Sequence, residues 1–335
     1  DASASLAALC DPAEEDDGAS APGLRTPLHL AAAHDSAEVV QLLLDRRADV
    51  ASCVSGCPWA VTPLHECASS DAGRAARVLA AVAAAASLAP ELWRELPPAA
   101  EEEPGVRWAR FLDPLQAKVG ALGETPLHRA AQEDAPSVVS ALLEARADPD
   151  LGDEHGDTAV HTAVLYAAPR ALAELLARGA DPAAENGSGE LPLHFLAEFG
   201  TGGWEGEVTE ALVRRHFARS LRAQELLVEA LRGRGQLGHA VAHVSPVTGD
   251  TALHAAAKWD HLGAEHAVGL LLAGGADLRR KNHDGHVPLE VAVRRHGSSG
   301  RVARALAAAV GALPGDVGAA DSPVLPLEHS ASLGA

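Results

Sequence analysis

Apolar residues recur along the chain at spacings of three and four, in pairs of short runs. Counting from Thr125, they fall two, five and six positions later, and again 13, 14, 17 and 18 positions later. The same offsets follow Thr26, and the pair at 17 and 18 also follows Thr158. Such spacings place the apolar side chains on one face of a helix. Each stretch therefore predicts two short amphipathic helices, and the small alanines of the first helix allow the second to pack close to it.

The first predicted helix of each stretch starts with a recurring sequence motif, which we call the repeat word. Its seven copies are TPLHLAA from Thr26, TPLHECA from Thr62, TPLHRAA from Thr125, TAVHTAV from Thr158, LPLHFLA from Leu191, TALHAAA from Thr251 and VPLEVAV from Val287. Successive copies are separated by 36, 63, 33, 33, 60 and 36 residues, and a recurrence near 33 is typical of a stacked array of repeats. A glycine two places before the first letter predicts a hairpin-like turn between units. It stands at Gly123, Gly156, Gly189, Gly249 and Gly285.

Two of these intervals exceed 33 by most of a unit, namely by 30 and by 27 residues, which predicts two long insertions, near 88–122 and 200–222. The first interval is close to twice 33, but it contains no T-x-L-H word, so we favour an elaborated loop over a degenerate unit. In the second interval, residues 207–221 predict an extra helix ahead of the unit's own second helix at 223–231. Long insertions in an array map to one face and often carry function.

The T-P-L-H-x-A word, the paired leucines and the G-A-D sequence after the second helix stand in register, and together they resemble the ankyrin repeat. The resemblance covers residues 23–313 in about seven units. It implies an all-α solenoid of stacked helix-turn-helix units with hairpin-like loops. An acidic leader over 1–22 and a small, polar tail over 314–335 flank the array, and we expect both to be disordered.

The threonine and the histidine of each copy are expected to be structural. Thr125 can cap the helix, and Pro126 suits the first helical position, where its missing N–H costs nothing. The resemblance implies that the histidine hydrogen-bonds the threonine and the neighbouring loop backbone. These histidines are His29, His65, His128, His161, His194 and His254. Leu191 and Val287 cannot cap, and Glu290 replaces the histidine in the unit that we expect to close the array.

Composition narrows the class of protein. A net charge of −19 argues against nucleic-acid binding, which needs a basic stripe, and no apolar run approaches the length of about 18 residues that a membrane span needs. Four clustered cysteines are too few for a disulfide framework, and no signal peptide is visible, which favours an intracellular location, in the cytoplasm or the nucleus. Because the chain lacks methionine and begins at Asp1, we expect a fragment or a processed product. We also expect a monomer.

Several chemical motifs are weaker than they look. The segment GRGQLG at 233–238 matches the dinucleotide-binding pattern G-x-G-x-x-G, yet it follows a predicted helix where such a site requires a strand. Cys53, Cys57 and Cys67 with His65 are ligand types suited to zinc, but their spacing is irregular. Small hydrophobic side chains in a turn and a helix are the favoured interpretation. We therefore predict no catalytic, cofactor-binding or metal-binding residues and no enzyme activity.

Partner binding is the function that the sequence favours. Ankyrin arrays generally bind partners with the turn tips and the exposed face of the first helix, here four, seven and eight residues after the first letter of each copy. At offset eight, successive units carry Tyr166, Phe199 and Trp259, although the chain has only ten aromatic residues (5 Trp, 4 Phe and 1 Tyr). Large aromatics are enriched at interface hot spots. The predicted site also contains Phe195, Glu198, Leu165 and Lys258, with Arg294 and Arg295 in a basic C-terminal flank.

We predict a non-catalytic scaffold that binds a protein or peptide on its concave surface. One alternative is that the insertions fold back over this face, so that the aromatics are merely their core. Another is that the array is the targeting or substrate-adaptor part of a larger enzyme or ubiquitin-ligase complex, whose other domains are missing from this fragment. A catalytic or adaptor domain elsewhere in the full reading frame would favour that alternative.

Overall fold

The computed structural model describes residues 25–50, 52, 61–88, 115–120, 122–198 and 210–311. Each of the seven sequence copies begins a unit. The first helices of the units are α2 (Pro27–Ala33), α4 (Pro63–Ser69), α6 (Pro126–Gln132), α8 (Ala159–Leu165), η3 (Pro192–Phe195), α12 (Ala252–Ala257) and α14 (Pro288–His296). The second helices are α3 (Ala37–Asp45), α5 (Gly73–Leu88), α7 (Pro136–Glu144), α9 (Pro169–Ala177), α10 (Glu210–Gly233), α13 (Leu262–Ala273) and α15 (Arg301–Gly311), and α11 (Leu237–Ala242) follows α10.

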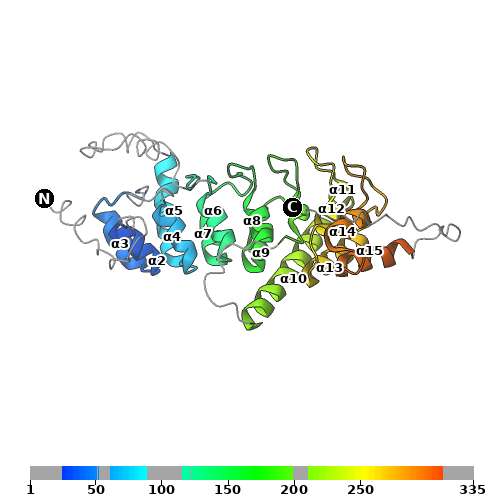
Figure 1. Cartoon of the computed structure of the whole chain (residues 1–335). Coiled ribbons are helices and arrows are strands. Elements are labelled where there is room, and N and C mark those ends of the chain that lie inside the picture. The colour runs from blue at the N-terminus through cyan, green and yellow to red at the C-terminus, as the bar shows by residue number, and fades with distance from the viewer. Residues whose placement is uncertain are drawn as a thin grey trace, which may run out of the picture.

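The units stack into two parallel rows of helices. Each first helix contacts the first helix of the next unit, and each second helix contacts the next second helix. The result is the elongated array of Figure 1, with the loops between units projecting along one edge. Within the described ranges the β-pairing is a single bridge between Val119 and Glu124. The predicted all-α solenoid of two-helix units is therefore confirmed.

The core runs the length of the array between the two rows. Leu127, Ala130 and Leu142 of the third unit are at most 2% exposed, and residues at the same offsets in neighbouring units join the same cluster. Small alanine side chains keep the first helices close to their neighbours. This continuity explains why no single unit would be stable alone, because each buries its apolar face against the units on either side.

The repeated histidine ties each unit to the next. Nδ1 of His128 accepts hydrogen bonds from the backbone N–H of Thr125 (3.3 Å) and from its hydroxyl (2.7 Å). Nε2 lies 2.7 Å from the carbonyl oxygen of Asp157 in the following unit. A carbonyl oxygen only accepts, so Nε2 carries the proton and the ring is neutral. The equivalent links run from His29 to Val61, from His65 to Glu124, from His161 to Glu190 and from His254 to His286.

Burial keeps these imidazoles uncharged. It is the largest cause that lowers the pKa of His65 to about 3 and those of His161 and His194 to about 4. Burial also lowers the pKa of His29, His128 and His254. In the fifth unit, where Leu191 offers no hydroxyl, its backbone N–H still donates to Nδ1 of His194 at 3.1 Å. The histidines therefore have the structural role that the sequence resemblance implies.

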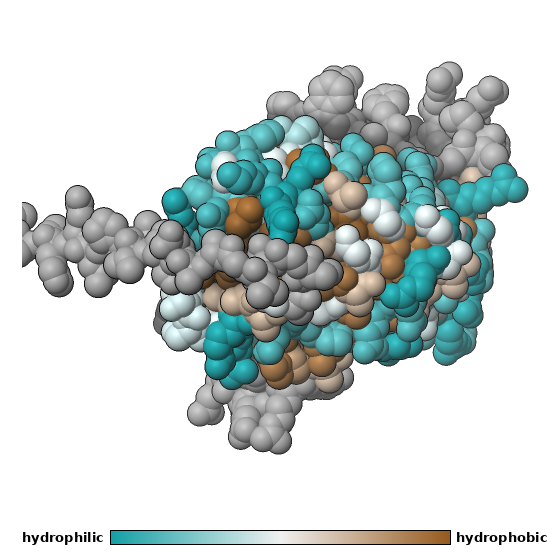
Figure 2. Space-filling view, turned by 90° about the vertical axis from the view of Figure 1, so that its right-hand side faces the viewer, coloured by the Kyte–Doolittle hydropathy of each residue, from teal (hydrophilic) through white to brown (hydrophobic). Residues whose placement is uncertain are grey.

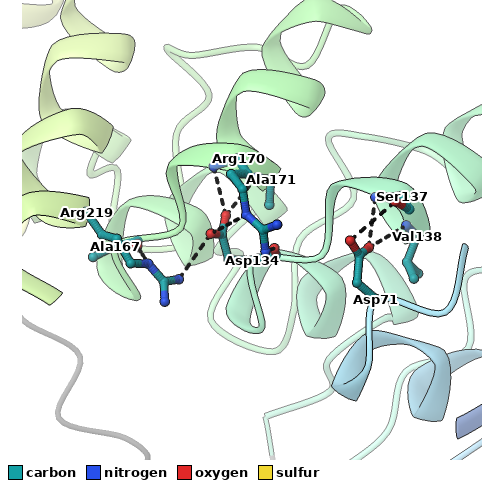
Figure 3. Close-up of polar contacts among 8 residues, drawn as sticks. All are labelled: Asp71, Asp134, Ser137, Val138, Ala167, Arg170, Ala171 and Arg219. Carbon is teal, nitrogen blue, oxygen red and sulfur yellow. Dashed lines mark hydrogen bonds and ion pairs between the residues drawn. The ribbon is translucent and has the colours of Figure 1, made fainter. Parts of the chain in front are cut away.

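A second link between units depends on aspartates that the sequence analysis did not single out. Oδ1 of Asp134, in the turn after α6, accepts the backbone N–H groups of Arg170 (2.8 Å) and Ala171 (2.9 Å) at the start of α9. Oδ2 of Asp134 lies 3.1 Å from Nε of Arg170 and 3.3 Å from Nη2 of Arg219. Asp71 caps α7 in the same way, and Figure 3 shows both carboxylates pointing at the helix of the following unit. Each carboxylate satisfies backbone donors that a helix start leaves without intrahelical partners.

The capping aspartates share one turn conformation. Asp35, Asp71 and Asp134 have φ of 49°, 51° and 55°, in the left-handed region that Asp tolerates better than most residues. The fourth unit instead places Ala167 there, with φ of 51°. Its carbonyl oxygen accepts a hydrogen bond from Nε of Arg219 at 3.0 Å. An alanine in this conformation is strained by about 1–2 kcal/mol.

Replacing Ala167 by glycine should therefore raise the free energy of unfolding, by up to about 1 kcal/mol, because glycine adopts the left-handed conformation without strain. The matched control is Ala168→Gly, since Ala168 is equally buried but has φ of −105°. That change should lower the free energy of unfolding by about 1 kcal/mol. Urea unfolding curves of the two variants should therefore shift in opposite directions, and shifts of the same sign would contradict the strain at Ala167.

The prediction of a separate extra helix at 207–221 was wrong. The structure has one helix, α10, of 24 residues, which includes the expected second helix at 223–231. No glycine or proline stands between 210 and 232 to stop it, so the helix continues through both segments. Its first turns extend past the ends of the neighbouring helices (Figure 1). Of the first insertion, residues 89–114 lie outside the described residues.

The last unit differs from the internal ones. Oε2 of Glu290 accepts the backbone N–H of Val287 at 3.0 Å and so replaces one bond of the missing histidine. Leu289 and Val293 are only half-buried, whereas Leu127 and Ala131 at the same offsets are buried. Figure 2 views this end of the array and shows apolar groups among hydrophilic ones. Among the described residues, the last unit thus combines half-buried apolar side chains with exposed charged ones such as Arg294 and Arg301.

Candidate partner-binding surface

We define the first-helix face as the outward side of α8, η3, α12 and α14 together with the loops that precede them. Tyr166 follows α8 directly and is half-buried, and Trp259 follows α12 at 37% exposure. Phe199, the third member of the predicted aromatic column, lies outside the described residues. Because α8 contacts η3 and η3 contacts α12, the two described aromatics flank the fifth unit from either side.

The other predicted site residues differ in how open they are. Phe195 is half-buried against the core, and its ring meets that of His161 edge-on at 5.6 Å between centroids. Leu165 and Glu198 are also half-buried. Nζ of Lys258 lies 2.8 Å from Oδ2 of Asp250. These four residues lie on three successive first helices or directly after them.

The basic flank lies farther along the array. Arg294 and Arg295 are exposed in the last turn of α14, in the seventh unit. Because α14 contacts α12 but is two units beyond η3, the structure separates the arginines from Phe195 and Glu198. They belong to the C-terminal end of the first-helix face.

A row of carboxylates on this face escaped the sequence analysis. The residue just before the first letter of the repeat word is acidic in four successive units, namely Glu124, Asp157, Glu190 and Asp250; we call these four residues the acidic row. Alignment of the copies at that position would have found it. Three of these residues also offer the backbone carbonyl that accepts the Nε2–H bond of the preceding unit's histidine. The row is thereby fixed to the rigid part of the fold.

Burial and neighbouring charges change the ionisation of these groups, and the cations act against burial: Arg129 lowers the pKa of Glu124, and Lys258 lowers those of Glu190 and Glu198. Burial is the largest cause that raises the pKa of Glu124, Asp157, Glu190 and Glu198, and neighbouring carboxylates raise each of them further. Burial also acts on Asp250, but hydrogen bonds from Lys258 and Asn282 outweigh it and lower the pKa of that carboxyl. The row is therefore neutralised at its C-terminal end and poorly neutralised in its middle.

The structure gives no support to the chemical motifs set aside above. Cys67 is fully buried, and burial raises the pKa of its thiol to about 12, so it stays protonated and is a poor metal ligand. Cys53 and Cys57 lie outside the described residues. The segment 233–238 joins α10 to α11, with a helix where a dinucleotide site needs a strand. Among the helices that the structure describes, none is long and apolar enough to cross a membrane.

Comparisons with known proteins agree with this architecture. A family model described as ankyrin repeats in three copies matches residues 108–186, and one described as an ankyrin repeat matches 24–54 and 248–283. The comparison with curated proteins gives no match. Among solved structures, the human ASB11 ankyrin repeat domain is similar, with 22% identity and a TM-score of 0.54 over 85% of this chain and 97% of that one.

A second similar structure is the ankyrin repeat domain of Bcl-3, described as a unique member of the IkappaB protein family. It is 24% identical, with a TM-score of 0.52 over 84% of this chain and 98% of that one. At such identities the two likenesses show the fold alone. Together with the family matches and the seven stacked units, they show that the chain is an ankyrin repeat protein.

Proposed function

We propose that this chain is a non-catalytic scaffold that binds a partner protein or peptide on its first-helix face. Ankyrin repeat domains are generally protein–protein interaction modules, and their fold is typically non-catalytic. The observation that carries the proposal is the exposed Trp259, at 37% exposure, with half-buried Phe195 and Tyr166 on the two preceding units of the same face. The net charge of −19 supports a protein partner over nucleic acid. We propose an intracellular monomer.

Truncating the aromatics of the predicted column should weaken partner binding without unfolding the array. Trp259→Ala and Tyr166→Ala should each cost about 2 kcal/mol of binding free energy, because large side chains at the centre of an interface dominate its energetics. Phe199→Ala tests the same column. The measurement is capture of the partner from native extract, followed by calorimetry with the partner identified in it.

Charge reversal at Arg294 or Arg295 should mainly slow association, since charges at the rim steer the encounter.

The matched control is Leu262→Ala on α13, because Leu262 is 51% exposed but belongs to the row of second helices. It should leave partner capture unchanged. If Tyr166→Ala or Phe199→Ala unfolds the protein, the aromatics are core beneath an insertion. If Leu262→Ala weakens capture as much as Trp259→Ala, the binding face is not the first-helix face.

One observation favours the adaptor alternative, in which the array belongs to a larger enzyme or ubiquitin-ligase complex. Leu289 and Val293 in the last unit are half-buried where internal units bury the same positions. That end face has apolar area to seat a further unit or domain. The full-length reading frame tests this alternative directly, because it requires a catalytic or adaptor domain outside these residues.

A further inference from the structure

Among the described residues, the middle of the first-helix face has more carboxylates than cations. At one end of the acidic row, Arg129 lies 3.7 Å from Glu133, close to Glu124; at the other, Lys258 pairs with Asp250 at 2.8 Å. Between them, Asp157 receives a neutral amide, Nδ2 of Asn186 at 2.8 Å. Within the described part of the chain, no ion pair reaches Glu190 or Glu198. Lys258, which pairs with Asp250, also lowers the pKa of Glu190 and Glu198, so this cation is shared among three carboxylates.

This arrangement costs the free protein stability, and the fold does not require it. Glu190 contributes its backbone to the repeat, since its carbonyl oxygen accepts from His161 and its N–H donates to Asn186. Its side chain is half-buried, and its pKa is raised because lost solvation, together with the carboxylates of Asp157 and Asp250, outweighs the opposite effects of Lys258 and Ser245. Groups that disfavour the free state and have no structural role are typical of binding sites.

Aromatic side chains are an independent feature of the same place. Phe195 stands three residues before Glu198, and its half-buried ring packs edge-on against His161. Tyr166 lies one unit before, and Trp259 one unit after. A cation is attracted to the face of an aromatic ring as well as to a carboxylate, and arginine in particular forms planar contacts with both. Burial of apolar area would then add to the charge attraction.

We propose that the segment bound on this face is cationic: an extended stretch of a partner protein that places a lysine or arginine side chain among Asp157, Glu190 and Glu198. This inference rests on the proposed function and specifies the chemistry of the partner. The acidic row repeats once per unit, so an extended segment lying along the array meets one carboxylate after another. The histidine links fix the backbone of the row in advance, which reduces the ordering cost of binding.

The charge pattern also sets a direction for the bound segment. Arg294 and Arg295 are exposed at the end of α14, and Arg279, Arg280 and Lys281 precede that unit. A uniformly basic segment would be repelled there. The segment that fits this face has a short cationic stretch opposite the third to sixth units and neutral or acidic residues toward the seventh unit. A shifted register would place like charges opposite each other, which disfavours it.

The test uses the full chain and short fluorescent peptides in a polarisation titration. One peptide carries two arginines spaced by glycine and serine, a second carries citrulline in their place, and a third continues the arginine stretch with aspartates on one side. We expect the arginine peptide to bind about tenfold more tightly than the citrulline peptide. The peptide with aspartates should bind more tightly still. Equal binding of arginine and citrulline peptides, or no binding of any peptide, would overturn the proposal.

Charge-neutralising variants locate the effect. Glu190→Gln and Glu198→Gln should each weaken arginine-peptide binding by about tenfold, while their thermal midpoints stay equal to or above that of the parent. Glu229→Gln on α10, an exposed residue in the second-helix row, makes the same charge change and should leave binding unchanged. An equal loss in Glu229→Gln would show attraction to net charge alone and would overturn the proposal.

The outcomes separate this inference from the proposed function. If cationic peptides fail but Trp259→Ala still abolishes capture of the native partner, the first-helix face binds a partner and the cationic preference is wrong. If Trp259→Ala also leaves capture intact, the proposed function itself fails. An unfolded variant would also lose binding. The thermal midpoints of Glu190→Gln and Glu198→Gln therefore show whether a loss of binding comes from unfolding.

Discussion

Asp134→Ala should lower the free energy of unfolding by about 2–3 kcal/mol, because it removes a helix cap and, with it, a buried carboxylate that pairs with two partly exposed arginines. The carboxylate is only 5% exposed, and it is held by two backbone N–H groups of α9 and by the side chains of Arg170 and Arg219. Without it, the start of α9 has no acceptor from the preceding unit. The alanine also adopts the left-handed conformation that aspartate tolerates better. Urea unfolding followed by circular dichroism measures the change.

Two variants divide this loss into its causes. Asp134→Asn keeps an acceptor oxygen and the turn conformation but removes the charge, so it should cost about half as much. Asp35→Ala removes a carboxylate that also caps two N–H groups, those of Arg74 and Ala75. There Arg74 pairs with Glu38 instead, so the expected cost is about 1–2 kcal/mol. An equal cost at Asp35 and Asp134 would show that the two arginines contribute nothing.

The parts of this fold that could be predicted from sequence depend on local signals. The Thr-Pro start places α4 and α6 correctly at Pro63 and Pro126, because a capping residue followed by proline determines a helix start within a few residues of chain. The recurring interval near 33 then implies the stacking. The separate helix expected at 207–221 failed because no breaking residue divides it from 223–231.

Features that depend on contacts between units were missed. An aspartate stands nine residues after the first letter in four copies, at Asp35, Asp71, Asp134 and Asp260. Its partners lie 36 to 67 residues away, so a helical pattern within one unit does not show its role. The acidic row could have been found by aligning the copies, but the burial of its carboxylates and their effect on one another depend on neighbouring units. For the aromatics, sequence indicated exposed offsets, whereas Tyr166 at offset eight is half-buried and Phe195 at offset four packs against His161.

Acidification should destabilise the array steeply, because its repeated histidines are built to be neutral. Each Nδ1 of the type seen at His128 accepts hydrogen bonds, and protonation of that nitrogen would break them. Burial lowers the pKa of His65 to about 3 and of His161 to about 4, below the value of about 6.5 in an unfolded chain. Between those values the unfolded state binds more protons than the folded state. Stability is therefore undiminished above about pH 6.5 and falls as the pH decreases toward 4.

The buried carboxyls act in the opposite direction, but they should not cancel this loss. The raised pKa values of Glu124, Asp157, Glu190 and Glu198 favour the folded state as these groups gain protons on acidification. There are four such carboxyls, and all are half-buried. The repeat word contributes six histidines with a lowered pKa, and all six are buried. Each histidine that stays neutral in the folded state lowers the free energy of unfolding by about 1 kcal/mol per pH unit, between the pKa of the unfolded chain and its own lower pKa in the folded protein. We therefore expect a net fall of several kcal/mol between about pH 6.5 and pH 5.

Thermal unfolding at a series of pH values measures this fall, and single substitutions assign it. His128→Gln should lower the midpoint at neutral pH, since it breaks the link to Asp157, but its midpoint should then depend less steeply on pH than that of the parent. His239→Gln, on the exposed side of α11, removes one histidine from the same chain and is the exposed control variant. A midpoint that stays constant down to about pH 5 would mean that the histidines of the repeat accept protons without breaking their bonds between units, and the neutral tautomer assigned from the carbonyl contacts would be wrong.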